Sequence, residues 1–287
     1  MATPLPWCHL NGQQLLLTEA RVSPLDRSFL FGDGIYEVIP VYGGRLFRPQ
    51  AHFDRLDRSA AAIRLTNPHS SADWQALLQR LIDANGSGDQ YVYLQLSRGA
   101  EHGRNHAPLP QIPPTVFAYC SPWPTVAAST LSEGLACITA QDTRWARCDI
   151  KSVALLANVL LRQLAVDANA AETILLRDGE MLEGSASTVH VVRDGILLTP
   201  PNSTRLLPGT TRGVVKELAD GMGLARRDAR ISEADLRGAD EIWLASATRE
   251  VQPVTRLDGV PVGSGLPGPV WRRIYDAYQQ LKSLHPV

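Results

Sequence analysis

The stretch RCDIKSVALLANVLL, residues 147–161, places one lysine directly before a long apolar segment. Lys151 is one of three lysines among 28 lysines and arginines, and the other two, Lys216 and Lys282, lie where helical patterns predict surface charges. Lys151 instead follows an expected strand and precedes an expected buried helix. Burial and the positive end of a helix both disfavour a protonated amine, and a Schiff-base lysine must react as the free amine. The alternative is a lysine that extends into solvent or pairs with Asp149.

Length and composition restrict the class of protein. The chain has 287 residues, of which 44% are hydrophobic and 20% are charged, and its formal net charge is -1. This is enough apolar material for one large core or two domains, and the net charge is too small for a disordered chain. The neutral balance argues against nucleic acid or a membrane as a partner, and no apolar run approaches the roughly 18 residues that cross a bilayer.

Cysteines and histidines form no metal-binding pattern. Cys8, Cys120, Cys137 and Cys148 are far apart and include no CxxC pair, and the seven histidines include no HExxH pair. We therefore expect buried, reduced thiols in a cytoplasmic protein, and no metal site.

The first part of the chain alternates between strand and helix patterns. Residues 35–42, IYEVIPVY, alternate as a strand does, and Gly43-Gly44 predicts a hairpin turn into residues 45–47. Apolar residues then recur at helical spacing in two helices, the second opened by Ser70 or Ser71. Further strands are expected at residues 91–97 and 115–119.

The second part continues the mixed pattern. Residues 121–130 are rich in Pro, Ser, Thr and Ala, which predicts a linker. Beyond it we expect strands at 136–140, 171–176, 189–198 (broken by a turn) and 241–246, and helices at 153–168, 211–222 and 270–284. The prediction is a mixed α/β (α+β) protein with a small N-terminal domain, residues 1–120, and a larger C-terminal domain, residues 131–287.

Three features could hold an anion, and one acid could hold a ring nitrogen. Leu207-Pro208-Gly209-Thr210-Thr211-Arg212 is a glycine turn that opens a helix, so backbone N–H groups there would point at a phosphate. Ser246-Ala247-Thr248 offers hydroxyls after a strand, and Arg55 could reach inward from its helix. Glu183, expected between two strands, could hold a pyridine nitrogen protonated. An ordinary cap, turn or salt bridge remains the alternative for each.

These motifs together resemble the fold type IV pyridoxal-phosphate enzymes. FGDGIYEV, HFDRL, RCDIKS, EGSAS and LPGTTRG stand in that family's order and at about its spacing. Within the family, the sequence is most similar to the aminotransferases that act on D-amino acids. The resemblance covers nearly the whole chain, from about Leu25 to the last helix, and implies a larger, barrel-like C-terminal lobe.

The resemblance also implies roles for individual residues. Lys151 matches the lysine that forms the Schiff base and shuttles the substrate proton, and Glu183 matches the acid at the ring nitrogen. Leu207, in the same turn as Thr210, is also expected to bind the cofactor. Arg55, Thr210 and Thr211 match the phosphate site, and Ser246 and Thr248 flank its remaining contact. Ala247 stands where the family has a hydroxyl, so that contact must come from the backbone or be absent.

Tyr36, Arg104 and His106 match the residues that bind the substrate carboxylate. In the family, the arginine-x-histidine pair reaches across from the partner subunit, which implies a homodimer. The loop between Arg98-Gly99 and Arg104 is about one residue longer here than in the family. The resemblance therefore implies ping-pong transamination between a D-amino acid and a 2-oxo acid, pyruvate or 2-oxoglutarate.

Other activities occur on the same scaffold. A branched-chain L-aminotransferase lacks the arginine-x-histidine pair, an (R)-amine transaminase does not require a carboxylate, and an aminodeoxychorismate lyase eliminates pyruvate. The Arg104-Asn105-His106 motif favours the D-amino-acid alternative, because an arginine fork matches a carboxylate. A non-catalytic binding protein, in which Lys151 is structural, is the alternative from a different class.

Overall fold

Strand β3 (Gly34–Tyr42) organises the first part of the chain in the computed structural model, which describes residues 3–86 and 88–284. The expected alternation is present: Ile35, Glu37, Ile39 and Val41 are fully buried. Gly43 and Gly44 adopt positive φ angles and turn the chain into β4 (Arg45–Leu46), as predicted. The carboxylate of Glu37 therefore lies on the buried face of β3, between Ile35 and Ile39.

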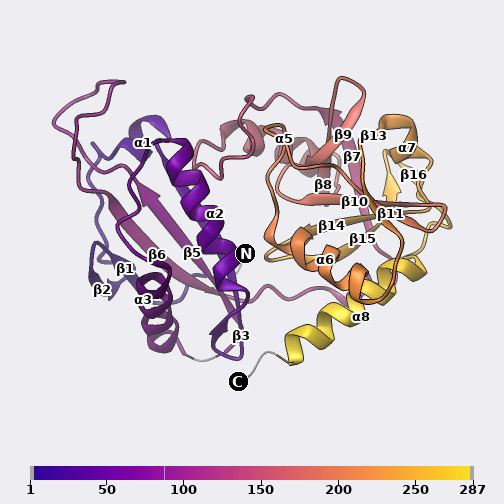
Figure 1. Ribbon diagram of the computed structural model, residues 1–287, viewed down its shortest axis with the longest axis horizontal. Helices are drawn as coiled ribbons and strands as arrows, with labels where there is room; N and C mark the ends of the chain where they lie inside the picture. Colours follow the sequence, from indigo (N-terminus) through magenta and orange to yellow (C-terminus); the bar gives the residue numbers. More distant parts are fainter. Residues whose placement is uncertain (1–2, 87, 285–287) are drawn as a thin grey trace. The chain divides into compact units, whose positions relative to one another are not determined.

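Six antiparallel strands form the sheet of this first unit, in the order β2-β1-β6-β5-β3-β4 (Figure 1). Its remaining strands are β1 (Trp7–Leu10), β2 (Gln13–Leu16), β5 (Gln90–Ser97) and β6 (Thr115–Pro122). Strands β1 and β2 were not predicted from the sequence, although Asn11-Gly12 between them is a hairpin signal and both residues have positive φ angles. Each strand has only four residues, too few for a clear alternation.

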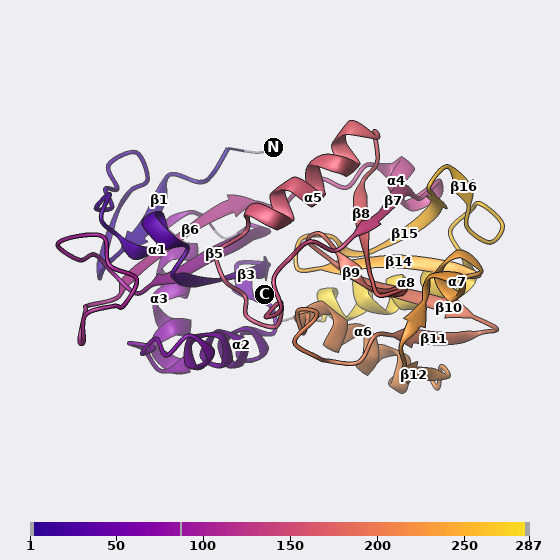
Figure 2. The ribbon, with the colours of Figure 1, turned by 90° about the horizontal axis from the view of Figure 1, so that it is seen from above.

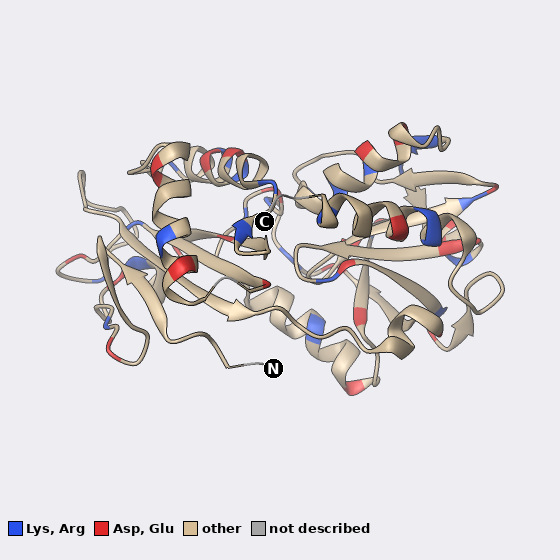
Figure 3. Cartoon of the chain, turned by 90° about the horizontal axis from the view of Figure 1, so that it is seen from below, with Lys and Arg blue, Asp and Glu red and all other residues tan. Residues whose placement is uncertain are grey.

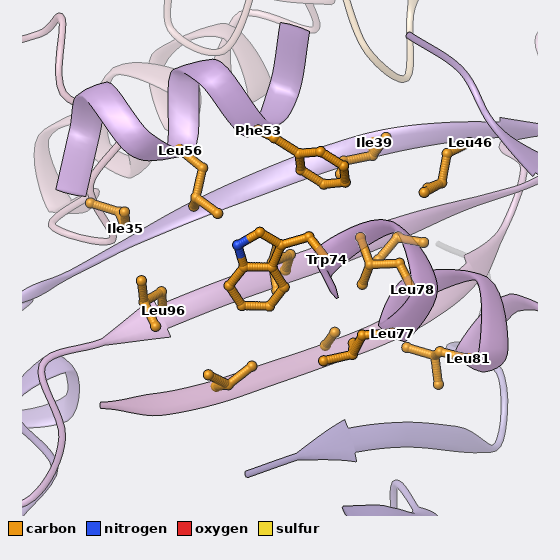
Figure 4. Close-up of a cluster of buried hydrophobic side chains, with 14 of the residues drawn as sticks. Ile35, Ile39, Leu46, Phe53, Leu56, Trp74, Leu77, Leu78, Leu81 and Leu96 are labelled. Atoms are coloured by element: carbon orange, nitrogen blue, oxygen red, sulfur yellow. The ribbon is translucent and has the colours of Figure 1, made fainter. Parts of the chain in front are cut away.

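Helices α2 (Pro49–Ala62) and α3 (Ser71–Ala84) pack on this sheet. Ser70 caps α3 and forms a capping box with Asp73, which confirms the predicted start of this helix. Figure 4 shows Phe53 and Leu56 of α2, with Trp74 and Leu78 of α3, pointing into the core above the strands. The short helix α1 (Arg27–Phe31) precedes β3.

Residues 150–155 belong to this first unit and not to the second. The backbone N–H of Tyr36 donates to the oxygen of Lys151 at 3.0 Å, and that of Val153 donates to the oxygen of Gly34 at 3.0 Å. Ser152 forms an antiparallel bridge with Ile35. The expected helix 153–168 therefore begins only at Leu156, because the preceding backbone is paired with β3. The C-terminal domain expected at residues 131–287 includes residues 150–155, which in the structure belong to the first unit.

The second unit, residues 125–149 and 156–284, contains a ten-stranded mixed sheet. Along the sheet the order is β12-β11-β10-β14-β15-β7-β8-β9-β13, and β16 pairs with β15. Its strands are β7 (Leu135–Gln141), β8 (Glu172–Arg177), β9 (Glu180–Gly184), β10 (Thr188–Arg193), β11 (Ile196–Thr199), β12 (Arg226–Asp228), β13 (Ile231–Ser232), β14 (Glu241–Ser246), β15 (Glu250–Leu257) and β16 (Val260–Pro261). The sheet curls (Figure 2), which agrees with the expected barrel-like lobe.

Helices cover parts of this curled sheet. Contacts join α5 (Leu156–Asp167) to β8, and α6 (Thr210–Gly221) and α8 (Pro269–Ser283) to β14. The short helices are α4 (Ala128–Ser132) and α7 (Glu233–Arg237). Within each unit, basic and acidic residues are interspersed along the ribbon (Figure 3), as the near-zero net charge predicts. No helix in the described part of the chain is long and apolar enough to cross a membrane.

Candidate active site

Lys151 lies against β3 in the first unit. Its backbone oxygen accepts from Tyr36, and its backbone N–H donates to Oγ of Ser59 in α2 at 3.2 Å. Nζ lies 4.1 Å from the centre of the Tyr36 ring, within the range of a cation–π contact. The structure therefore brings together two residues that the sequence analysis assigned to the same site, and it fixes the lysine through its backbone.

A buried ionic cluster lies beside this lysine. Arg55, on α2, donates from Nε to Oε1 of Glu37 at 2.8 Å and from Nη2 to Oε2 at 2.7 Å, while Nδ1 of His52 lies 2.8 Å from Oε2. Burial alone would raise the pKa of Glu37, but the charge and hydrogen bonds of Arg55, with His52, lower it to about 2. Burial holds the pKa of His52 below its usual value. Glu37 is therefore a permanent anion that orients Arg55.

Glu183 lies in the second unit, within strand β9, whereas the sequence predicted a position between two strands. Its Oε1 accepts from Nη1 of Arg144 at 2.5 Å, and its two oxygens lie 3.2 and 3.1 Å from the backbone nitrogen of Leu207. Burial raises the pKa of Glu183, and the charge and hydrogen bond of Arg144 offset this only in part. Arg144 and the N–H of Leu207 thus orient a buried carboxylate that can accept a hydrogen bond from a protonated ring nitrogen.

Leu207 opens the predicted phosphate turn in the same unit. Its N–H donates to Glu183, so the structure links the turn to the acid. Helix α6 begins at Thr210, and its N-cap residue, Gly209, provides no side-chain hydrogen bond. A Cβ at Gly209 would lie 2.6 Å from Oγ1 of Thr188, so this close approach requires glycine. Uncapped N–H groups at the start of a twelve-residue helix suit an anion, and Thr211 is buried there.

Ser246 and Thr248 follow strand β14 as predicted. The Ser246 hydroxyl accepts from the backbone N–H of Arg249 at 3.3 Å, which is a turn-closing contact. Thr248 and the intervening Ala247 are half-buried. The structure thus places these residues at the expected strand end and adds no contact that assigns them to a phosphate.

Arg104 and His106 lie in an exposed loop between β5 and β6. The Arg104 guanidinium carbon is 5.2 Å from the ring centre of Phe31, and the His106 ring centre is 5.5 Å from it. Both side chains of the predicted pair therefore share one aromatic neighbour, at the end of α1. The structure places them with Phe31 and not with Tyr36.

Several residues in these clusters were missed by the sequence analysis. The signal for Glu37 was present, because a carboxylate at an inward position of an alternating strand must find a buried partner. His52 and Arg55, three residues apart on α2, share the helix face that provides it. Arg144, and Asp142, which accepts from its Nε at 2.9 Å, gave no such signal, because they lie in an irregular segment after β7.

The other lysines and the cysteines differ from Lys151 in their surroundings. Nζ of Lys216 pairs with Asp228 at 2.7 Å and Nζ of Lys282 pairs with Glu250 at 2.7 Å, so both are partly buried ion pairs and not freely solvated charges as expected. The four cysteines are free and buried. Within residues 3–86 and 88–284, no group of three or more His, Cys, Asp or Glu side chains could hold a metal ion.

Comparisons with known proteins point to one family. The family model Amino-transferase class IV matches residues 34–257. The chain is 38% identical over 279 residues to a D-alanine aminotransferase of Staphylococcus aureus (strain MSSA476), covering 97% of this chain and 98% of the relative. It is 40% identical over 269 residues to a D-alanine aminotransferase of Bacillus licheniformis, covering 94% of each.

Solved structures agree on the fold. The branched-chain amino acid aminotransferase of Escherichia coli matches with a TM-score of 0.92 at 27% identity, covering 96% of this chain and 94% of that one. A T.th. branched-chain amino acid aminotransferase, solved with pyridoxamine 5'-phosphate, matches with a TM-score of 0.90 at 27% identity, covering 97% and 94%.

Proposed function

The chain belongs to the class IV aminotransferases, which depend on pyridoxal phosphate, and we propose that it transfers the amino group of a D-amino acid to a 2-oxo acid such as pyruvate or 2-oxoglutarate. The observation that carries the proposal is Lys151, which is bound to β3 with Nζ over Tyr36. D-alanine aminotransferases among its relatives and the Arg104-Asn105-His106 motif support the D-specificity.

The residues described fit this cofactor. Its ring nitrogen needs a carboxylate that accepts a hydrogen bond from the protonated ring, and Glu183 is a buried carboxylate held in place by Arg144 and the N–H of Leu207. Its phosphate needs fixed donors, and we assign Arg55, oriented by Glu37, and the N–H groups of Thr210 and Thr211 to that role. Leu207 would act through its bond to Glu183, and Ser246 and Thr248 are assigned by resemblance alone.

When bound, pyridoxal phosphate supplies an aldehyde that condenses with amines and a protonated ring that withdraws electrons from the bond that breaks. Lys151 would hold the cofactor through Nζ, and its amine, once free, would carry the proton that leaves the substrate Cα. Glu183 would accept a hydrogen bond from the ring nitrogen and so favour its protonated form. Return of the amino group to a second 2-oxo acid would complete a ping-pong cycle.

Recognition of the substrate carboxylate is assigned to Tyr36, Arg104 and His106. A guanidinium binds a carboxylate through two parallel hydrogen bonds, which an amine substrate without a carboxylate cannot form. As in the family that the chain resembles, we propose that Arg104 and His106 act in the site of the partner subunit.

A homodimer is therefore part of the proposal. Helix α5 exposes apolar side chains on one face, with Leu156 72%, Val159 60% and Leu160 60% exposed, and Leu164 continues this row. Such a stripe on a single chain suits burial against a second copy. We also propose a cytoplasmic location, which the four free, buried cysteines support.

A substrate panel tests the function. The purified protein, saturated with pyridoxal phosphate, is assayed with D-alanine, D-glutamate, L-leucine and (R)-1-phenylethylamine against both oxo acids. We expect turnover with the D-amino acids and loss of it in Lys151→Ala, while the matched control Lys216→Ala keeps its activity. Preference for L-leucine would instead support the branched-chain activity named for the similar solved structures.

A further inference from the structure

Arg27, the first residue of α1, is a buried arginine whose hydrogen bonds reach the exposed loop of residues 100–112. Its side chain is 4% exposed. Nη1 donates to the backbone oxygen of Asn105 at 2.6 Å, and Nη2 donates to that of His106 at 2.9 Å. Nε donates to Oδ2 of Asp33 at 2.8 Å. One guanidinium therefore joins the loop backbone to the body of the first unit.

A carboxylate of the same loop completes this attachment. Glu101 is buried, and its Oε1 accepts from Nη1 of Arg27 at 3.2 Å and from the backbone N–H of Leu109 at 3.0 Å. Residues 102–111 are all exposed, so the loop has little apolar packing of its own. A loop of this kind keeps one conformation only through such polar anchors.

The aromatic ring of Phe31 lies beside Arg27 and also beside the side chains of Arg104 and His106. The Arg27 guanidinium carbon lies 4.6 Å from the ring centre, and that of Arg104 lies 5.2 Å from it. The His106 ring packs on Phe31 at 5.5 Å between centres. Arg27 thus holds the backbone at Asn105 and His106, and its aromatic neighbour contacts the two side chains that flank Asn105.

We propose that Arg27 is a positioning residue for substrate recognition: it holds the loop so that Arg104 and His106 are presented as a preformed trap for the substrate carboxylate. The inference rests on the proposed function of these two residues. Preforming the trap removes the entropy cost of ordering an exposed loop when substrate binds. Arg27 itself touches only protein groups in this arrangement.

The choice of arginine follows from the geometry. Two backbone oxygens and two carboxylates surround one planar group whose five N–H donors point in fixed directions. Lysine keeps the positive charge, but its ammonium is a single point with three donors and cannot span these acceptors. Arg27→Lys therefore separates the anchoring geometry from the charge.

Arg98→Lys is a matched control. Arg98 donates to the same Asp33, from Nε at 2.8 Å and from Nη2 at 3.0 Å, but its backbone contacts are the oxygens of Ile63 and Arg64 and not the loop. If Arg27 only stabilises the fold, the two variants should behave alike. If it positions the trap, only Arg27→Lys should change substrate binding.

The holoenzyme and both variants are compared in two experiments. In steady-state assays, Arg27→Lys should raise KM for D-alanine about tenfold with a smaller change in kcat, and leave KM for (R)-1-phenylethylamine, which has no carboxylate, unchanged if that amine is accepted. In limited proteolysis, trypsin should cut after Arg104 faster in Arg27→Lys than in wild type or Arg98→Lys.

Each other result overturns the proposal. Faster cleavage with an unchanged KM for D-alanine would mean that the loop is anchored but forms no trap, and unchanged cleavage would mean that Arg27 does not anchor it. If wild type shows no transamination, the proposed function fails, while the cleavage rates still report on the anchor. If Arg27→Lys does not fold, Glu101→Gln must produce both changes in weaker form, or the inference is wrong.

Discussion

The pairs Glu37–Arg55 in the first unit and Glu183–Arg144 in the second each join a buried glutamate to an arginine, and they differ in the direction in which the pKa of the glutamate is shifted. In the first unit, Arg55 lowers the pKa of Glu37 to about 2 against the effect of burial. In the second unit, burial raises the pKa of Glu183 in spite of Arg144. An arginine partner therefore lowers the pKa of one buried glutamate below its ordinary value and leaves that of the other raised.

The two pairs differ in the number of hydrogen bonds that the arginine gives to the glutamate. Arg55 gives two hydrogen bonds to Glu37, one to each oxygen. Arg144 gives Nε and Nη2 to Asp142, at 2.9 and 3.0 Å, and only Nη1 to Glu183. Burial alone would raise the pKa of Asp142, but Arg144 lowers it, and the resulting negative charge raises the pKa of Glu183. Burial is the main cause of the raised pKa of Glu183, and Arg144 offsets it only in part because Asp142 shares the charge of this arginine.

The largest effect is expected on the free energy of unfolding, when the negative charge of Glu37 is removed. Glu37→Gln leaves Arg55 buried without its counter-charge, and breaking a buried ion pair costs about 3–5 kcal/mol. The free energy of unfolding, from denaturant titration of the protein at pH 7, measures this loss. The matched control is Glu180→Gln, whose carboxylate pairs with Arg205 and Arg230 nearer the surface. If Glu37→Gln lowers the free energy of unfolding by less than about 1 kcal/mol, Glu37 does not stabilise the fold as a buried ion pair, and the contrast with Glu183 is wrong.

Glu183→Gln should affect turnover and spare stability. Its amide oxygen can still accept from Arg144 and from the N–H of Leu207, so we expect a stability change under about 1 kcal/mol. The lost proton-holding group should lower kcat about 100-fold with every accepted substrate. Steady-state kinetics of this variant beside Glu180→Gln check the expectation, and unchanged kcat would assign the ring nitrogen to another group.

The contributions of Glu37 and Glu183 to stability should change with pH in opposite directions. The pKa of Glu37 is lower in the folded protein, so its stabilisation is present above its ordinary pKa and is lost as the pH falls towards about 2. The stability difference between wild type and Glu37→Gln should therefore shrink by about 3 kcal/mol between pH 6 and pH 2. Since the folded-state pKa of Glu183 is raised, wild type should lose stability relative to Glu183→Gln as the pH rises above the ordinary value. Parallel curves for either pair would contradict the assignment.

The smallest effect is expected from changing Asp142, the second carboxylate that accepts from Arg144. Asp142→Asn removes the negative charge beside Glu183 and leaves more of the charge of Arg144 to it, so the pKa of Glu183 should fall. Carbon-13 NMR of labelled glutamate, with Glu183 assigned from the Gln variant, measures this pKa. Asp178→Asn, at an exposed carboxylate, serves as the control. A rise, or no change, would show that Asp142 does not determine the proton affinity.

These clusters also show how far the sequence could lead. The alternation at Ile35 to Val41 predicted β3, and the setting of Lys151 singled it out, because both signals are local. The pairing of Glu37 with Arg55 joins a strand to a helix 18 residues later, and the pairing of Glu183 with Arg144 joins residues 39 apart. The alternation of β3 marks Glu37 as an inward-facing residue, but no local period identifies the partner of either glutamate.

Two further misses have physical causes. The apolar residues after Lys151 predicted a helix from Val153, but hydrogen bonds to Gly34 hold that backbone against β3 and delay α5 to Leu156. The role of Arg27 depends on a loop some 78 residues later in the sequence. Long-range pairing, and not local propensity, decides both cases.

The central claim is that Lys151, of the three lysines in the chain, holds the cofactor. Borohydride reduction of the protein saturated with pyridoxal phosphate fixes the Schiff base to its lysine, and mass spectrometry of the digested protein locates the modified peptide. We predict one pyridoxyl group per chain, on the peptide that contains Lys151. Modification of Lys216 or Lys282 in its place, or no modification at all, would contradict the account.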